Sequence, residues 1–173
     1  MKVHDIFSYE NEKFAGVRQP ARDVIGAYQS ANRFLDTVQE YILIIMGMPH
    51  FASVIHNLAH EMPKRFDDFA DMLHERHLMA EYPATEELDI FAEVKDADAV
   101  FGLIIRILDH VGEALEAFRA KTDSADLRPM CLKAEELIAQ NSADYTKILA
   151  MWSRFDNEGG SWTSFDAWCG ELE

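Results

Sequence analysis

Imidazole and carboxylate side chains are concentrated between His50 and His77, a segment that holds five of the seven histidines of the chain. Five positions in this segment share one helical direction, namely His56, His60, Asp67, Asp71 and His74. A helix turns by about 100° per residue, so these positions fall within roughly 40° of a common direction. Because imidazole nitrogens and carboxylate oxygens bind iron, zinc and manganese, this histidine-aspartate stripe is a candidate metal site.

The opposite side of the same segment is apolar at the spacing of a buried helix face. Its residues are Phe51, Ile55, Leu58, Met62, Phe66, Phe69 and Leu73. The pattern therefore predicts a helix that packs on a core and presents the stripe. Two other interpretations of the stripe remain open. It can be a solvated face that titrates near pH ~6.5 without binding a metal, or a structural interface.

Four long segments with helical periodicity must position these residues. They span about 20–46, 49–78, 97–121 and 125–155. Short links join the first pair and the second pair, whereas residues 79–96 form a long connection. The pattern predicts an all-α fold, a four-helix bundle with a ferritin-like outline and a long connection between the second and third helices. The aromatic-rich tail 156–173 should pack as a short helix on this subunit or a neighbour. We expect residues 1–173 to form a single domain.

Two local features bear on the geometry of the first two helices. Seven residues of the first helix are expected on its inward side: Val24, Tyr28, Ala31, Leu35, Val38, Ile42 and Ile45. In the second helix, Pro63 lacks the N–H that would bond to the carbonyl of Ala59, and an internal proline usually bends a helix. Such a bend would rotate the two halves of the stripe relative to each other.

Composition limits the classes of function. The chain has 173 residues, 49% of them hydrophobic, and a formal charge of −15 from 31 acidic and 16 basic residues. This charge opposes direct nucleic-acid binding, and the first fourteen residues contain only Lys2 and Lys13 as bases. Cys131 and Cys169 fit neither a disulfide framework nor a Cys-x-x-Cys site. With no signal segment and no long apolar run, we expect a soluble, cytoplasmic protein without membrane contact.

The spacing of the stripe resembles a known family. His56 is followed after fourteen residues by Asp71, and Asp71 after three by Glu75 and Arg76. This pattern is similar to the iron-binding helix of miniferritins, the starvation-induced DNA-protecting branch of the ferritin-like superfamily. Gly47 and Phe51 precede the first histidine as in that family, although the interval from glycine to histidine is two residues longer. The predicted bundle agrees with the resemblance, which marks the chain as a divergent member.

The resemblance implies an iron site shared between two subunits. His56 would come from one subunit, and Asp71 and Glu75 from its two-fold mate. Such proteins oxidise Fe(II), preferentially with hydrogen peroxide, and store the ferric product in a hollow dodecamer. For this chain the resemblance implies a non-haem di-iron ferroxidase that forms a homo-oligomer through its second helix. Zinc and manganese also suit the same side chains.

The sequence departs from the family pattern at one ligand. The family has a further histidine near the end of the first helix, where this chain has only aliphatic residues at 42–45. His60 or Asp67 could replace it, so the expected ligand set is His56, His60, Asp67, Asp71 and Glu75. The basic DNA-binding tail of some members is absent, and DNA binding is not implied.

Alternatives to the shared site also remain open. A ferritin-type di-iron centre inside one bundle uses Glu-x-x-His motifs, which no predicted helix contains. The nearest candidates lie beside the apolar faces: Asp36, Glu40, Asp109, His110, Glu113, Glu135 and Glu136. A second alternative is a non-catalytic helical-bundle interaction protein that has lost metal chemistry. A third, an acidic mimic that blocks a nucleic-acid-binding partner, rests on charge alone.

Overall fold

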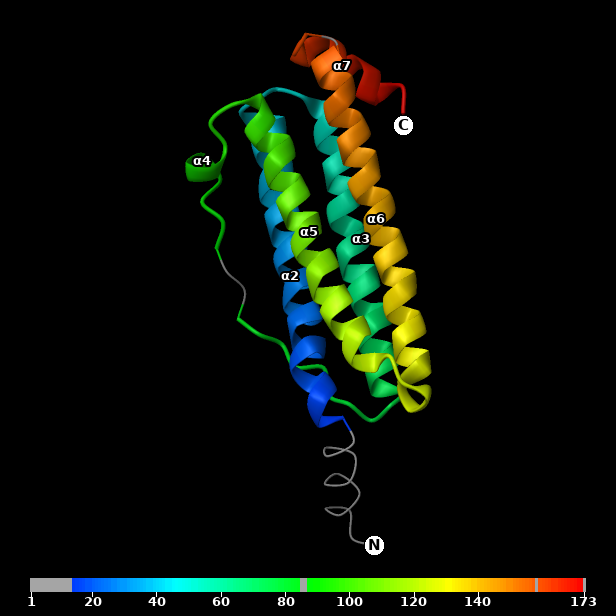
Figure 1. The fold of residues 1–173 in the computed structure, drawn as a ribbon. Helices are drawn as coiled ribbons and strands as arrows, with labels where there is room; N and C mark the ends of the chain where they lie inside the picture. The colour runs from blue at the N-terminus through cyan, green and yellow to red at the C-terminus, as the bar shows by residue number, and fades with distance from the viewer. Residues whose placement is uncertain (1–13, 85–86, 158, 173) are drawn as a thin grey trace, which may run out of the picture.

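Four long helices form the body of the molecule in the computed structural model, which describes residues 14–84, 87–157 and 159–172 (Figure 1). They are α2 (Ala15–Ile44), α3 (Pro49–His74), α5 (Ala97–Thr122) and α6 (Arg128–Asn157). Two short helices, α4 (Ile90–Glu93) and α7 (Trp162–Gly170), and the 3-10 turn η1 (Ala125–Leu127) complete the described chain. None of these residues forms a strand, and the predicted all-α bundle is confirmed.

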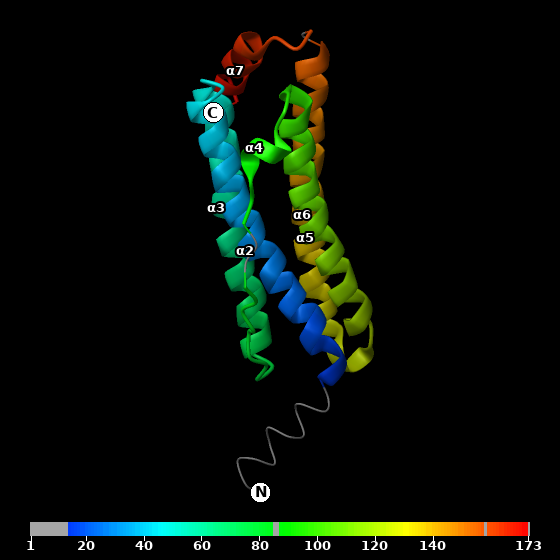
Figure 2. The same ribbon diagram turned by 90° about the vertical axis from the view of Figure 1, so that its left-hand side faces the viewer.

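Helices α2 and α3 are antiparallel neighbours, as are α5 and α6, and α2 also packs along α5. Figure 2 shows the two pairs as the two halves of the bundle. The connection from α3 to α5 runs along the outside of the bundle beside α2 and carries α4 (Figure 1). Gly26 allows this approach, because a Cβ atom there would lie 2.7 Å from Cγ of Pro83 in the connection. The predicted long connection is confirmed, and α4 within it was not predicted.

The core consists of the apolar faces of all four helices. On α2, six of the seven residues expected inward are fully buried. The expectation for Ile45 is wrong, since this side chain is 57% exposed. The reason is that α2 ends at Ile44 and the chain turns through Gly47, whose φ is +68°. Ile45 is thus the C-cap of α2, the last position before the chain leaves the direction of the helix.

Helix α3 continues through Pro63 without interruption, from Pro49 to His74. The carbonyl of Ala59, which loses its helical donor at Pro63, accepts a hydrogen bond from Nδ2 of Asn32 on α2, 3.1 Å away. A side chain of the neighbouring helix thus replaces the missing backbone donor. As a result, the two halves of the stripe belong to one helix.

The C-terminal helix α7 closes one end of the bundle, as predicted for the tail, and it packs on its own chain. Phe165 and Cys169 are fully buried. The ring of Phe165 lies 5.1 Å from that of Phe51 in the first turn of α3. Asp166 accepts a hydrogen bond from the backbone N–H of Phe51 at 2.8 Å, and so satisfies a donor that the start of a helix leaves free.

Cys131 and Cys169 are buried and not joined in a disulfide, in agreement with the sequence-based interpretation. Among the described helices, none is long and apolar enough to cross a membrane. The expectations for Lys2 and Lys13 concern the first thirteen residues, which lie outside the described part of the chain.

Candidate metal site

All residues of the predicted ligand set lie on the outer face of α3 or at its end. His56, His60, Asp67 and Asp71 are exposed side chains within the helix. Glu75 is exposed too and follows the last helical residue as its C-cap. His74 completes the stripe and is 56% exposed. The predicted two-faced helix is confirmed, because the apolar side of α3 faces the core and the stripe faces outward.

Two pairs of stripe residues lie close together. The rings of His56 and His60 are one helical turn apart, with their centroids 4.3 Å from each other. One Oδ of Asp71 lies 4.0 Å from Nδ1 of His74. Asp71 and Glu75 also line a shallow hollow of about 300 Å³ with Arg76. Each pair offers donors for a metal, but neither pair is a complete coordination shell.

The two pairs are far apart within one chain. His56 and Asp71 are separated by fifteen positions, which corresponds to roughly 22 Å along a helix. Among the described residues, no group of three or more His, Cys, Asp or Glu side chains is close enough to hold a metal ion. A single copy of the chain therefore does not bring the predicted ligand set together.

The end of α2 contributes no ligand to this face. Ile42 is buried in the core, whereas Leu43, Ile44 and Ile45 are exposed by 43, 72 and 57%. The departure from the family pattern noted above is therefore present in the structure, with apolar side chains at the place of the family's further histidine. His60 is the described histidine nearest to His56 on the stripe.

The inside of the bundle holds an ion pair. Arg65 of α3 pairs with Asp144 of α6, and the two side chains are only 9 and 20% exposed. The hydroxyl of Tyr28 on α2 is buried near them without a hydrogen-bond partner among the described residues. Burial raises the pKa of Tyr28 far above its ordinary value of 10, so this phenol is neutral. A buried guanidinium repels a metal cation at this place.

Sequence reasoning missed this interior ion pair, although a signal for it existed. Arg65 lies on the side of α3 opposite His56, among the apolar residues Met62 and Phe69. A charged residue at a core position indicates a buried partner, because an isolated buried charge is too costly. The partner Asp144 could not be assigned from the sequence, because it lies on a helix 79 positions away.

Most candidates for a ferritin-type centre inside the bundle are exposed to solvent. Of the seven acidic and histidine residues considered for it, only Asp36 is half-buried and the other six are exposed: Glu40, Asp109, His110, Glu113, Glu135 and Glu136. The expectation that they lie beside the apolar faces is confirmed.

Known solved structures share this architecture. No protein-family model matches the chain, and no curated protein matches it in sequence. A crystal structure of a PmFTN variant soaked in iron for 45 min superposes with a TM-score of 0.80 at 12% identity, over 87% of this chain and 96% of that one. Another PmFTN variant, soaked in iron overnight, gives a TM-score of 0.76 at 13% identity, over 88 and 98%. The fold is ferritin-like.

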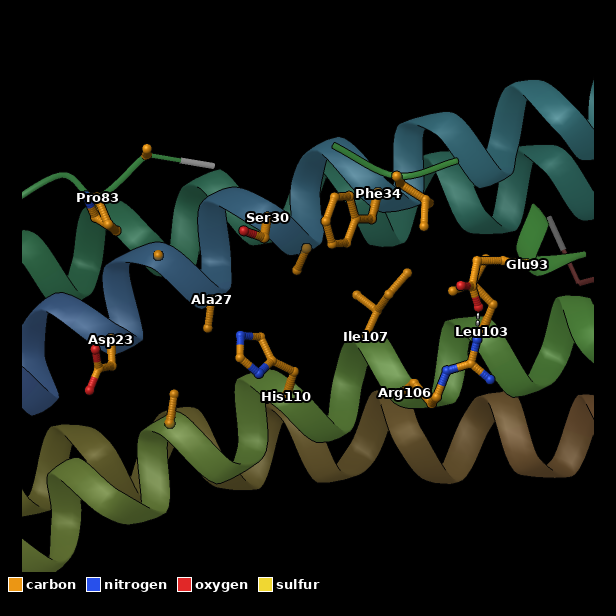
Figure 3. A pocket seen from close by; sticks show the side chains of 15 residues that line it. Asp23, Ala27, Ser30, Phe34, Pro83, Glu93, Leu103, Arg106, Ile107 and His110 are labelled. Carbon is orange, nitrogen blue, oxygen red and sulfur yellow. Dashed lines mark hydrogen bonds and ion pairs between the residues drawn. The ribbon is translucent and has the colours of Figure 1, made fainter. Parts of the chain in front are cut away.

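The ferritin-like bundle also has a cavity that none of the predicted ligands lines. It has a volume of about 550 Å³ and lies between α2, α5 and the long connection (Figure 3). Ala27, Phe34 and Ile107 line it, and His110 points into it from α5. At one end, Arg106 donates a hydrogen bond to Glu93 at 2.7 Å. The exposed stripe on α3 is a separate feature on the outer face of the bundle.

Proposed function

We propose that this protein binds Fe(II) at sites shared between two copies of α3 and oxidises it, as an iron-detoxifying or iron-storing protein of the miniferritin type. The ligands are His56 and His60 of one copy with Asp67, Asp71 and Glu75 of the other. The ferritin-like fold and the iron-soaked structures that share it support an iron-related function. The exposure of every candidate ligand supports a site between subunits.

The observation that carries the proposal is the symmetry of the stripe. The midpoint between His56 and Asp71 along α3 falls at the 63–64 peptide bond. His60 and Asp67 have the same midpoint. If two α3 helices meet antiparallel about a two-fold axis at this point, each histidine lies opposite an aspartate of the other copy. A single antiparallel arrangement of two α3 helices therefore aligns both histidine–aspartate pairs. Helix α3 is continuous at Pro63, next to the centre of this arrangement.

Such a dimer has two equivalent sites with suitable chemistry. Each combines two imidazoles with carboxylates at Asp67 and Asp71, and Glu75 lies one turn further along. Hard carboxylate oxygens favour Fe(III), whereas imidazole binds both oxidation states. In the reaction, two Fe(II) ions each lose one electron, and hydrogen peroxide takes up two electrons and two protons to give two molecules of water. The chain supplies the ligands that hold both iron ions close together, and iron is the substrate.

A subunit-mixing experiment tests the shared site. His56→Ala and Asp71→Ala should each abolish anaerobic Fe(II) binding and the ferric absorbance that follows addition of peroxide. Random mixing of the two variants makes half of the dimers mixed, and each mixed dimer has one intact site of two. The mixture should therefore recover about a quarter of the wild-type iron capacity.

His110→Ala provides the matched control, since His110 is an exposed histidine outside the stripe. This variant should bind as much iron as the wild type. If iron binds to the wild type but mixing restores none of the capacity, the site lies within one chain. If wild-type protein binds no Fe(II) at all, the proposed function is wrong.

The second candidate function is a helical-bundle interaction protein without metal chemistry. One observation favours it: Ile44 and Phe91 are large apolar side chains with 72 and 70% of their surface exposed. Phe91 lies beside Tyr41, with ring centroids 5.8 Å apart, next to the exposed end of α2. Exposed apolar clusters often mark protein interfaces. Elemental analysis of protein from cells grown with iron, zinc and manganese separates the two candidates.

A further inference from the structure

The cavity between α2, α5 and the long connection is elongated along the two helices (Figure 3). Its volume of about 550 Å³ is within the range of small-molecule sites. The residues that line it run from Asp23 to Phe34 on α2 and from Leu103 to Ala114 on α5. Each of these stretches corresponds to roughly 16 Å along a helix. A cavity of this volume and length is narrow.

Small side chains of α2 leave this space open. Three of them line the cavity: Ala27, Ser30 and Ala31. The connection is fixed to the helices at both ends of the cavity. Pro83 packs directly over Gly26 at one end, and Glu93 accepts a hydrogen bond from Arg106 of α5 at the other. The short side chains between these two points do not fill the space below the connection, so the fold itself forms the cavity.

Most of the wall is apolar and withdrawn from solvent. Four of the residues that line the cavity are buried: Ala27, Ala31, Leu103 and Ile107. Half-buried Phe34 of α2 and Leu88 of the connection add to this wall. A methylene chain that lies against these side chains is removed from water, which favours binding. The narrow shape and the apolar wall therefore match an aliphatic chain.

A polar group interrupts the apolar wall. The imidazole of His110 points into the cavity from α5 (Figure 3). A neutral imidazole has one donor and one acceptor, whereas a protonated one has two donors. A hydroxyl group both donates and accepts, so it can bond to this ring in either state. A ligand ammonium, by contrast, would be repelled by protonated His110.

The other charged groups of the wall oppose an anionic ligand. Asp23 lies toward the same end of the cavity as His110 and accepts a hydrogen bond from Gln19 at 2.7 Å (Figure 3). At the other end, the charges of Arg106 and Glu93 neutralise each other, with 2.7 Å between donor and acceptor. The formal charge of the whole chain, −15, adds to the repulsion of an anion. An uncharged polar group is therefore favoured beside His110.

We propose that this cavity binds an uncharged aliphatic alcohol of medium chain length. Its hydroxyl group bonds to His110, and its methylene chain lies along Ile107, Leu103 and Phe34. Each methylene group that leaves water adds to the affinity. None of the described residues that line the cavity belongs to the stripe on α3, so the site is independent of the proposed iron function.

Titration calorimetry with 1-decanol tests the proposal. We expect one saturable site per chain. In Ser30→Leu the dissociation constant should rise at least about tenfold, because the larger side chain takes the space of the ligand chain. The matched control is Ser153→Leu, the same substitution at an exposed position of α6 outside the cavity. The control should bind 1-decanol like the wild type.

A second variant tests the hydrogen bond to the ligand. His110→Phe keeps a ring at this exposed position but removes both nitrogens, so the dissociation constant should rise about fivefold. Decanoate, which has a charged carboxylate at the end of an equally long chain, should bind to the wild type about tenfold more weakly than 1-decanol. Equal affinity for the two compounds, or tighter binding of decylammonium, would overturn the assignment of an uncharged ligand.

Methyl NMR spectra locate the bound alcohol. The methyl signals of Leu103 and Ile107 should shift when 1-decanol is added, whereas that of Ile44 at the exposed end of α2 should not. Shifts at Ile44 without shifts at Leu103 and Ile107 would place the alcohol on the exposed apolar surface and refute the cavity site. The same spectra show whether Ser30→Leu is folded. Unchanged affinity in both Ser30→Leu and His110→Phe would also refute the proposal.

Discussion

Tyr28, Arg65 and Asp144 are three polar side chains at the centre of a mostly apolar bundle. The ion pair between Arg65 and Asp144 satisfies both charges, so removal of one partner would leave the other buried and unpaired. Tyr28 differs, because its hydroxyl is fully buried without a partner among the described residues. The burial of this hydroxyl without a partner therefore lowers the free energy of unfolding.

Tyr28→Phe tests this interpretation through the pH dependence of stability. At neutral pH the free energy of unfolding should equal that of the wild type or exceed it by up to about 1 kcal/mol, since an unsatisfied hydroxyl is removed. Above pH ~10 the unfolded tyrosine ionises, whereas burial raises the pKa of folded Tyr28 and keeps it protonated. The wild type should therefore lose more stability than the variant as the pH rises beyond this point.

Urea denaturation of both proteins at pH ~7, ~9 and ~11 measures the difference directly. The comparison cancels the contributions of the other tyrosines and of the lysines, which both proteins share. Parallel pH profiles for the wild type and the variant would contradict the assignment to Tyr28.

At the scale of elements, α2 and α3 are coupled through the proline of the stripe helix. Pro63 leaves the carbonyl of Ala59 without its helical donor, and Asn32 of α2 fills this role at 3.1 Å. The same peptide region is the centre of symmetry of the stripe. A side chain of α2 thus supports the continuity of the helix on which the proposed shared site depends.

A double-mutant cycle between Asn32 and Pro63 tests the coupling. Asn32→Leu should reduce the free energy of unfolding by about 1 kcal/mol in the wild-type background, because a partly buried carbonyl loses its donor. In the Pro63→Ala background the residue at position 63 regains its N–H, so the same substitution should cost close to nothing. The difference between the two costs is the coupling energy. Equal costs in both backgrounds would show that Asn32 does not compensate for the proline.

At the scale of the whole molecule, the outer face of α3 is polar along the stripe, and each chain has a formal charge of −15. Two like-charged copies repel each other, so an interface through this face needs a source of attraction. In the proposed dimer, cations bound between histidine and aspartate side chains would provide it. Lys64, at the proposed axis, forms an ion pair with Glu61, which lowers the pKa of that carboxyl through a hydrogen bond.

Cross-linking at the axis tests the arrangement of two copies. A cysteine at position 64 would approach its own copy in the other chain, so Lys64→Cys should give covalent dimers with a short bis-maleimide under anaerobic conditions. Fe(II) should increase their yield severalfold, because metal binding and association are linked. Ala150→Cys, on exposed α6 surface, is the control and should give few dimers. Native Cys131 and Cys169 are buried. Equal yields at both positions would argue against an antiparallel interface centred on α3.

Most of the fold could be predicted from the sequence, because apolar residues recur at helical spacing in four long segments. The predicted ends of these helices lie within five residues of the observed ones; the largest differences are that α2 begins at Ala15 instead of about 20 and that α3 ends at His74 instead of about 78. The exceptions have local causes: Ile45 is the C-cap of α2, just before the turn at Gly47, and α4 has only four residues, too few for a periodic signal. The prediction that α3 has one apolar and one ligating face needed only the identity and the order of its residues.

Tertiary structure decided what the sequence left open. Only packing shows that Asn32 reaches the carbonyl freed by Pro63 and that Arg65 meets Asp144. These contacts join residues at least 27 positions apart, which periodicity along the chain cannot relate. The sequence by itself determined which residues face outward on α3, because helical geometry is local. The separation of His56 from Asp71 within one continuous helix makes a second copy necessary for the proposed site.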